Sequence, residues 1–321
     1  MIPITRLQDG ADKALAGVKA RMKPFQTVLV AVAVAAVGCA AVYGLYAYRD
    51  QVAARNAYCI RPADLRLVQT TSWMTPEIAE EIHGSLNTLP PRLSVMDDDA
   101  AGRVAACLEK SPWVRKVHEV RFNAPRAGDQ TGGVDVSLSL RRPVAFVQIG
   151  EGAAARYVAI DREGLRVSRD PAAEPLLGDR VLLVITGVRS QPPGQGAVWG
   201  DPAVLAGADV AAAFQSDAGH DDAVRFKLAR IDVSNLGGLR DRKQPEIVIY
   251  TKDNGPRILW GGPRNKRTET LEGTPEEKVL CLRKLFLTEG SFEGHFDQID
   301  LVERQVRRLP TDTHHKASLR G

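Results

Sequence analysis

The longest uninterrupted apolar stretch of the chain lies near its N-terminus. No charged residue occurs from Phe25 to Tyr48. As a helix with ~1.5 Å rise per residue this stretch would be about 36 Å long, which exceeds the ~30 Å thickness of the hydrocarbon layer of a membrane. Tyr43 and Tyr46 join Tyr48 at its far end, where amphipathic rings favour the membrane interface. We therefore predict a transmembrane helix over residues 25–48.

Residues 59–142 alternate between strand-like runs and two amphipathic helical patterns. The first helix is expected to start at Thr75 and Pro76, because a capping hydroxyl followed by proline at the first helical position is typical of a helix start. The second is expected after residues 97–99, three aspartates that can cap it. Residues 134–140 alternate strictly between apolar and polar side chains, which predicts a strand with one buried face. The order strand, helix, helix, strand, strand predicts an α+β module with helices on one side of a small sheet.

Residues 143–309 show shorter strand-like runs, which predict a mostly antiparallel β domain with two helices. An alanine-rich helix is expected at 202–215. The second helix is expected to start at Thr274, since Thr274 and Glu277 have the spacing of a capping box and Pro275 occupies the first helical position. Two turns, a final strand and a disordered tail are expected at 161–164, 253–256, 296–302 and 310–321. The fold class predicted for the whole chain is α+β.

Charge is distributed unevenly along the chain. The formal net charge is +4, and residues 1–24 carry five basic side chains against two acidic ones. A basic flank before an apolar helix is typical of the cytoplasmic side of a membrane protein. We therefore expect a single-pass protein of the cell inner membrane, with a cytoplasmic tail at 1–24 and a periplasmic or extracytoplasmic region after residue 48. The nearly neutral remainder does not favour nucleic-acid binding.

Two other fates of the apolar stretch remain open. A cleaved signal peptide usually has an apolar core of only about 7–15 residues, which is shorter than this stretch. A lipoprotein signal would end at Cys39, which follows Ala36-Val37-Gly38, but the apolar run continues beyond this cysteine. A retained helix fits the pattern better than either alternative.

The chain shows no recognisable catalytic pattern. Its six histidines lie in unrelated segments, and the closest acid–imidazole pair, His295 and Asp297, would only share one face of a strand. No GxSxG, HExxH or P-loop pattern occurs. We expect no catalytic, cofactor-binding or metal-binding residue and no small-molecule substrate, so the chain is not predicted to be an enzyme.

The cysteines do not indicate a metal or redox site either. Cys39, Cys59, Cys107 and Cys281 form no CxxC pair. An oxidising compartment would permit a disulfide, for which Cys59 and Cys107 are the favoured pair. Buried free thiols are the alternative, and we favour it.

Short motifs follow one another in a particular order over residues 25 to about 307. They are Ser111-Pro112-Trp113-Val114, Arg142-Pro143-Val144-Ala145, Asp161 with Gly164, Ile231-Asp232-Val233-Ser234, Gly261, Lys278 and Ile299-Asp300-Leu301. In order and spacing the chain resembles the FtsQ/DivIB family of bacterial cell-division proteins. The resemblance implies a POTRA domain at 59–142, a second β-rich domain at 143–309, and a non-catalytic scaffold of septal wall synthesis, the divisome.

The resemblance also implies how partners bind. Members of the family pair a C-terminal strand with a strand of another division protein, here a small bitopic coiled-coil subunit of the FtsB/FtsL type. An edge strand permits this because its N–H and C=O groups are unpaired, whereas a covered strand does not. Val302 and Glu303 depart from the arginine and tyrosine usual in the family. The expected partner-binding residues are Phe296, Gln298, Ile299, Asp300, Leu301, Val302 and Val306.

A POTRA-containing factor in outer-membrane protein transport or assembly is the alternative function. Such proteins usually continue into a membrane barrel built from amphipathic strands of about 10 residues. The sequence after residue 143 does not show strands of that kind, so the pattern favours the scaffold.

Overall fold

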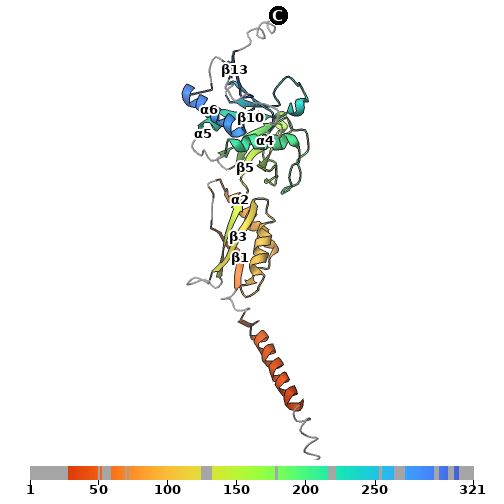
Figure 1. The fold of residues 1–321 in the computed structure, drawn as a ribbon. Helices are drawn as coiled ribbons and strands as arrows, with labels where there is room; N and C mark the ends of the chain where they lie inside the picture. The colour runs from red at the N-terminus through yellow and green to blue at the C-terminus, as the bar shows by residue number, and fades with distance from the viewer. Residues whose placement is uncertain are drawn as a thin grey trace, which may run out of the picture. The chain divides into compact units, whose positions relative to one another are not determined.

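The computed structural model describes residues 28–49, 51–52, 59–68, 71, 73–123, 132–177, 180–215, 222–252, 255–263, 272–292, 296–302 and 307–310. The fold is α+β, with one long apolar N-terminal helix, a four-stranded sheet, an eight-stranded sheet and a small two-stranded ribbon (Figure 1). The chain divides into two compact units. The smaller comprises Met1–Asp64, Pro91–Ala100 and Phe122–Val134, and the larger comprises Leu65–Pro90, Ala101–Arg121 and Asp135–Gly321.

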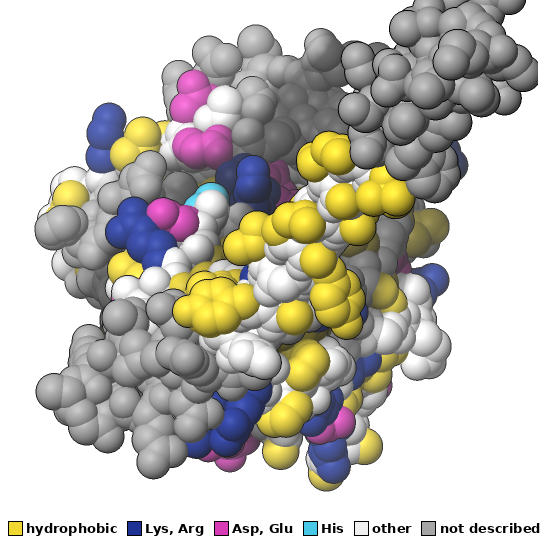
Figure 2. Space-filling view, turned by 90° about the horizontal axis from the view of Figure 1, so that it is seen from below, with side chains coloured by type: hydrophobic (Ala, Val, Ile, Leu, Met, Phe, Trp, Pro, Cys, Tyr) yellow, Lys and Arg dark blue, Asp and Glu magenta, His cyan; other side chains and the backbone are white. Residues whose placement is uncertain are grey.

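The N-terminal helix extends over Val28–Arg49 and has 22 residues. It is long and apolar enough to cross a membrane, and its apolar side chains, such as Val37 and Leu45, are exposed. An exposed apolar helix of this length is typical of a membrane anchor or a signal sequence. In the space-filling view, hydrophobic side chains form a broad band in which few charged side chains occur (Figure 2). The helix predicted at 25–48 is confirmed over the residues that the structure describes.

The four-stranded sheet has the strand order β2-β1-β4-β3. Helix α2 begins as predicted, because the Thr75 side chain accepts a hydrogen bond from the Ile78 amide and Pro76 opens the first turn. That hydroxyl also lies beside Glu77, whose pKa it lowers. Strand β4 alternates between buried and half-buried residues, as its sequence indicates. The elements are β1 (Cys59–Leu67), α2 (Pro76–Gly84), η2 (Ser85–Thr88), β2 (Leu93–Ser94), α3 (Ala100–Leu108), β3 (Val114–Asn123) and β4 (Gly132–Leu140).

The eight-stranded sheet has the strand order β14-β13-β12-β11-β10-β9-β5-β6. Its strands are β5 (Pro143–Ile149), β6 (Arg156–Asp161), β9 (Leu183–Thr186), β10 (Leu228–Asp232), β11 (Ile247–Thr251), β12 (Arg257–Gly261), β13 (Phe296–Asp300) and β14 (Arg307–Pro310). The short ribbon consists of β7 (Leu176–Leu177) and β8 (Arg180–Val181), and the 3-10 turns η3 (Gly152–Ala154) and η4 (Leu236–Gly238) lie in loops.

This sheet is mixed, with four antiparallel and three parallel strand pairs among the described residues, so the prediction of a mostly antiparallel domain holds only in part. Strand pairs β5–β9, β9–β10 and β12–β13 are parallel. Helical connections explain two of them, because a chain that leaves one strand and returns beside it in the same direction needs a long crossover. Helices α4 (Pro202–Ala213) and α5 (Asp222–Lys227) lie between β9 and β10 in the chain, and α6 (Pro275–Glu289) lies between β12 and β13.

In the part of the chain that the structure describes, three helices accompany the sheet instead of the two predicted. Helix α4 packs closely on it because its residues are small: a Cβ added at Gly207 would lie 2.8 Å from Cγ2 of Ile185. Helix α6 begins with the predicted capping box between Thr274 and Glu277. Side chains from α4, α6 and the central strands form one buried cluster, which includes Ile185, Val210, Ile231, Ile249, Trp260, Val279, Leu282 and Ile299.

Candidate functional site

Strand β13, the predicted docking strand, is paired on both sides. It is parallel to β12, with Ile299 opposite Ile258, and antiparallel to β14, with Ile299 opposite Arg308. Its Ile299 is buried, and so is Leu301, whose amide donates to the Leu259 carbonyl at 3.0 Å. The expectation that Phe296–Val302 is the last strand is therefore wrong.

The predicted partner-binding residues thus lie in different surroundings. Asp300 accepts a hydrogen bond from the Val302 amide at 2.9 Å and so shapes the turn after β13. Gln298 and Val302 are half-buried, and Phe296 is placed in β13 by its backbone. Val306 lies outside the described residues. Phe296 to Asp300 therefore lie in a strand that β14 covers on one side.

Strand β14 forms the outer edge of the sheet. Within the ranges that the structure describes, no strand pairs with its outer side. The sequence pattern misses this strand because Arg307 to Pro310 contains a single aliphatic side chain, Leu309. Pro310 could have indicated an edge strand here, since proline in a sheet is confined mostly to edge strands and strand ends. The backbone groups that an added strand would need therefore belong to β14.

The opposite edge, strand β6, is closed by the chain itself. The outward amides of Tyr157 and Asp161 donate to the carbonyls of Ala172 and Leu165 at 2.9 and 3.0 Å. Between them, the Ala159 amide donates to the Ser168 hydroxyl at 3.1 Å. Because alternate amides of a strand face the same side, these bonds satisfy the outward amides at three successive outward positions. This edge offers no row of unpaired groups to a partner.

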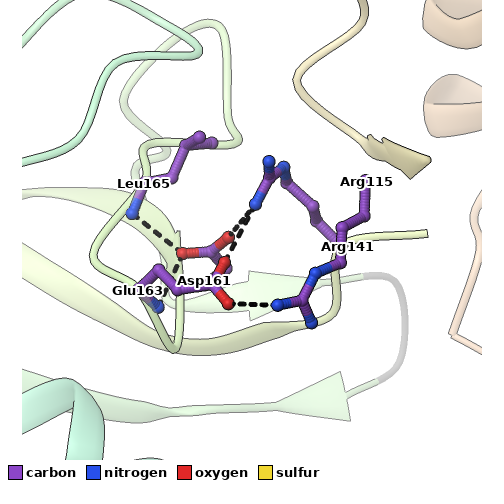
Figure 3. Close-up of polar contacts among 5 residues, drawn as sticks. All are labelled: Arg115, Arg141, Asp161, Glu163 and Leu165. Carbon is purple, nitrogen blue, oxygen red and sulfur yellow. Dashed lines mark hydrogen bonds and ion pairs between the residues drawn. The ribbon is translucent and has the colours of Figure 1, made fainter. Parts of the chain in front are cut away.

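An ion-pair cluster in the larger unit joins the hairpin after β6 to Arg115 and Arg141 (Figure 3). Arg141 binds Asp161 and Glu163 through Nη1, each at 3.0 Å, and Arg115 of β3 binds the other oxygen of Glu163 at 2.5 Å. Asp161 also accepts from the amides of Glu163 and Leu165 through Oδ1, at 2.9 and 2.8 Å. The Arg141 and Asp161 side chains are only 21% and 5% exposed. Asp161 therefore shapes the turn and holds Arg141 at the same time.

The turn itself requires glycine. Gly164 has φ of 75°, and a Cβ added there would lie 2.7 Å from Cδ2 of Leu205.

Three of the sequence motifs meet at this turn. The Arg141 amide donates to the Trp113 carbonyl at 2.7 Å, and Pro143 pairs with Asp161 between β5 and β6. The resemblance motifs at 111–114, 142–145 and 161–164 surround one junction in the larger unit.

A second group of polar contacts lies beside Trp113. Its indole Nε1 donates to Glu81 of α2 at 2.8 Å. Gln195 Nε2 donates to the other oxygen of Glu81 and, at 3.1 Å, to the Val167 carbonyl. Because Glu81 accepts from two segments far apart in sequence, it ties α2 to the loop that precedes α4.

The remaining motif residues meet in the core beside α6. Lys278 is buried, and its Nζ donates to the Trp260 carbonyl and lies 3.5 Å from Glu272. Glu272 also accepts from the Gly262 amide at 3.3 Å. A Cβ added at Gly261, where φ is 102°, would lie 2.7 Å from Glu272 Oε1. Gly261 and Lys278 thus serve one structural purpose, which is to hold α6 against the end of β12.

Metal and thiol chemistry receive no support from the described part of the chain. No group of three or more histidine, cysteine, aspartate or glutamate side chains there could hold a metal ion. Cys59 and Cys107 are buried and are not joined in a disulfide. The Cys107 sulfur lies 3.2 Å from the Thr88 hydroxyl, a contact that suits a packed thiol.

Comparison with known proteins adds no family. No protein-family model matches the chain, and no curated protein matches it. Its class therefore rests on its own structure: an α+β protein with two mixed sheets and one long apolar N-terminal helix.

Proposed function

We propose that the protein is a non-catalytic, single-pass membrane scaffold of the septal wall synthesis complex. Its N-terminal helix anchors it in the cell inner membrane, with residues 1–24 in the cytoplasm and the two sheets outside. The basic side chains of that tail and the exposed apolar helix support this orientation.

The proposal assigns the region 59–142 to a POTRA domain and the region 143–309 to a β-rich partner-binding domain. The order of strands and helices in the first region is the one expected from the resemblance, with the short strand β2 added. The junction around Arg141 and Asp161 lies where the two regions join in sequence. The three quoted motifs that meet there support the resemblance.

The outer edge of β14 is the observation that carries the proposal. Partner strands add to sheet edges through main-chain hydrogen bonds, with side chains supplying specificity. The eight-stranded sheet has two edges, and only β6 is closed by neighbouring segments of the described chain. We therefore infer that a strand from a small bitopic coiled-coil subunit of the FtsB/FtsL type adds to β14, with β13 beneath it.

Paired proline substitutions test the docking edge. Consecutive amides of a strand face opposite sides, so Arg308→Pro and Leu309→Pro remove one outward and one inward donor. The variant that lacks the outward amide should lose binding to the purified partner subunit, measured with both proteins in nanodiscs, while its circular dichroism spectrum stays unchanged. If both proline variants bind the partner subunit with the affinity of the unaltered protein, strand addition at β14 is ruled out.

Location in the cell tests the function itself. A fluorescent fusion of the full chain should gather at midcell before constriction, and depletion should produce filaments with few septa. Uniform membrane fluorescence together with normal septation after depletion would contradict the scaffold proposal.

A further inference from the structure

A pocket opens in the larger unit at the carboxyl ends of the adjacent parallel strands β9 and β10. We call it the α4 pocket, and its volume is about 800 Å³. Its lining includes Gly187 just after β9, Val233 and Ser234 just after β10, and the first turns of α4. Ligands of open sheets with parallel strands commonly bind at this position, and ligand sites typically measure roughly 300–1,000 Å³.

One wall of the α4 pocket is a loop with a well-defined shape. Asn235 Oδ1 accepts from the amides of Arg240 and Asp241, both at 2.9 Å. Its Nδ2 donates to the carbonyls of Asp241, Gln244 and Pro245 at 2.8 to 3.1 Å. One side chain therefore holds the backbone of the loop from both sides. A wall organised in this way loses little conformational entropy when a ligand binds.

This loop presents an apolar side chain to solvent. Leu239 is 70% exposed although it lines the α4 pocket, and Leu205 of α4 lines it as well. Leu236, Val233 and Pro263 add further apolar lining. Leu239 is therefore an exposed apolar side chain at the mouth of a largely apolar pocket, which is the usual composition of a ligand site.

Acidic side chains exceed basic ones around the α4 pocket. Asp201, Asp209 and Glu246 line it, against Arg189. Each carboxylate is held in position: Asp201 accepts from the amide that follows Pro202, Asp209 lies 3.3 Å from Arg162, and Glu246 accepts from the Gly237 amide at 2.9 Å. These contacts fix the orientation of the three carboxylates. The amide donors at Asp201 and Glu246 are neutral, so those two carboxylates keep their negative charge. Among the residues that line the pocket, three carboxylates oppose one guanidinium, so the lining complements a cationic ligand.

We propose that the α4 pocket is a second docking site, which receives a peptide segment of a partner with an apolar side chain next to a lysine or arginine. The apolar side chain contacts Leu239 and Leu205, and the cationic side chain lies toward the carboxylates of the rim. This site goes beyond the proposed scaffold function and is independent of strand addition, since it lies at β9 and β10 in the middle of the sheet.

Binding of defined peptides to the full chain in phosphatidylcholine nanodiscs tests the proposal. The probe is a fluorescein-labelled octapeptide, Gly-Ser-Leu-Lys-Leu-Lys-Ser-Gly, followed by fluorescence anisotropy against empty nanodiscs. Matched probes replace the lysines with glutamate or the leucines with serine. Saturable binding of the first probe, and at least about tenfold weaker binding of the other two, is the expected result.

Substitutions locate the site. Leu239→Ser should weaken binding of the Leu-Lys probe about tenfold, whereas Leu287→Ser, at a leucine of α6 that is 74% exposed and lies outside the α4 pocket, should leave it unchanged. Glu246→Gln keeps an acceptor for Gly237 and should weaken binding about threefold. Equal binding of the glutamate probe, no effect of Leu239→Ser, or no saturable binding at all would each overturn the proposal. The Arg308→Pro and Leu309→Pro variants should bind this probe normally, which separates it from the β14 edge.

Discussion

The two edges of the eight-stranded sheet show how one fold treats equivalent backbone groups differently. At β6, the segment from Leu165 to Ala172 turns back and supplies partners for the outward amides. At β14, the described chain supplies none. Uncovered edges favour pairing with other chains, so proteins usually protect them. An edge closed by the chain's own residues therefore suits a fixed structural junction, and an uncovered edge suits a partner.

The ion pairs follow the same division. Arg115, Arg141, Asp161 and Glu163 form one cluster at the β6 end of the sheet, around the hairpin after β6 (Figure 3). Asp161 is the most buried of these charges and accepts hydrogen bonds from three donors. The stability of the closed edge should therefore depend on this one carboxylate more than on any other charge in the cluster.

Replacing Asp161 should break the closed edge and have the largest effect on stability. Asp161→Ala leaves Arg141 partly buried beside a single exposed carboxylate and leaves two turn amides without an acceptor. Loss of one partner of a buried pair costs about 3–5 kcal/mol, which for a domain of this size lowers the melting temperature by roughly 6–20 °C. Thermal unfolding of the full chain measures this effect. Asp170→Ala, at an exposed position, is the control, and equal melting temperatures for both variants would contradict the role assigned to Asp161.

Replacing Lys278 tests whether the open side of the sheet depends on its own buried ion pair. Lys278→Met keeps the length of the side chain but leaves Glu272, which is 12% exposed, without its cation. We expect a loss of about 3 kcal/mol in the free energy of unfolding. The double variant Lys278→Met/Glu272→Gln should recover most of this loss, because no buried charge then remains. Failure of the double variant to recover any stability would assign the loss to the hydrogen bond that Lys278 donates to the Trp260 carbonyl and not to the ion pair.

Replacing Arg115 should have the smallest effect and sharpens the contrast within the closed edge. The Arg115 and Glu163 side chains are 61% and 47% exposed, so water and salt screen their attraction. Arg115→Ala should cost less than about 1 kcal/mol, and the cost should vanish at about 1 M salt, where the Debye length is ~3 Å. Arg141→Ala is the matched comparison, and chemical denaturation measures both. A larger loss for Arg115→Ala than for Arg141→Ala would reverse the assignment of the central arginine.

The sequence predicted those elements whose signals are local. The uncharged run after Phe25 indicates the apolar helix, and the capping residues Thr75 and Thr274 identify the starts of α2 and α6. The alternation in β4 predicts its buried face. In each case the residues that carry the signal lie within a few positions of the structure they specify, so hydrogen bonding and periodicity suffice.

Strand neighbours could not be predicted in this way. Strand β14 has four residues and one aliphatic side chain, so it has no recognisable period, and the error about β13 follows from missing it. The parallel pairs were missed because the sequence shows the connecting helices without showing where the returning strand lies.

For this protein, the sequence by itself determined the apolar N-terminal helix, the helix starts and the α+β class, because those depend on composition, caps and period. Only the tertiary structure decided that motifs at 111–114, 142–145 and 161–164 meet around Asp161, and that β13 is covered while β14 is the outer strand. Those outcomes depend on contacts between residues far apart in the chain, which form only when burial of the common core brings the strands into register.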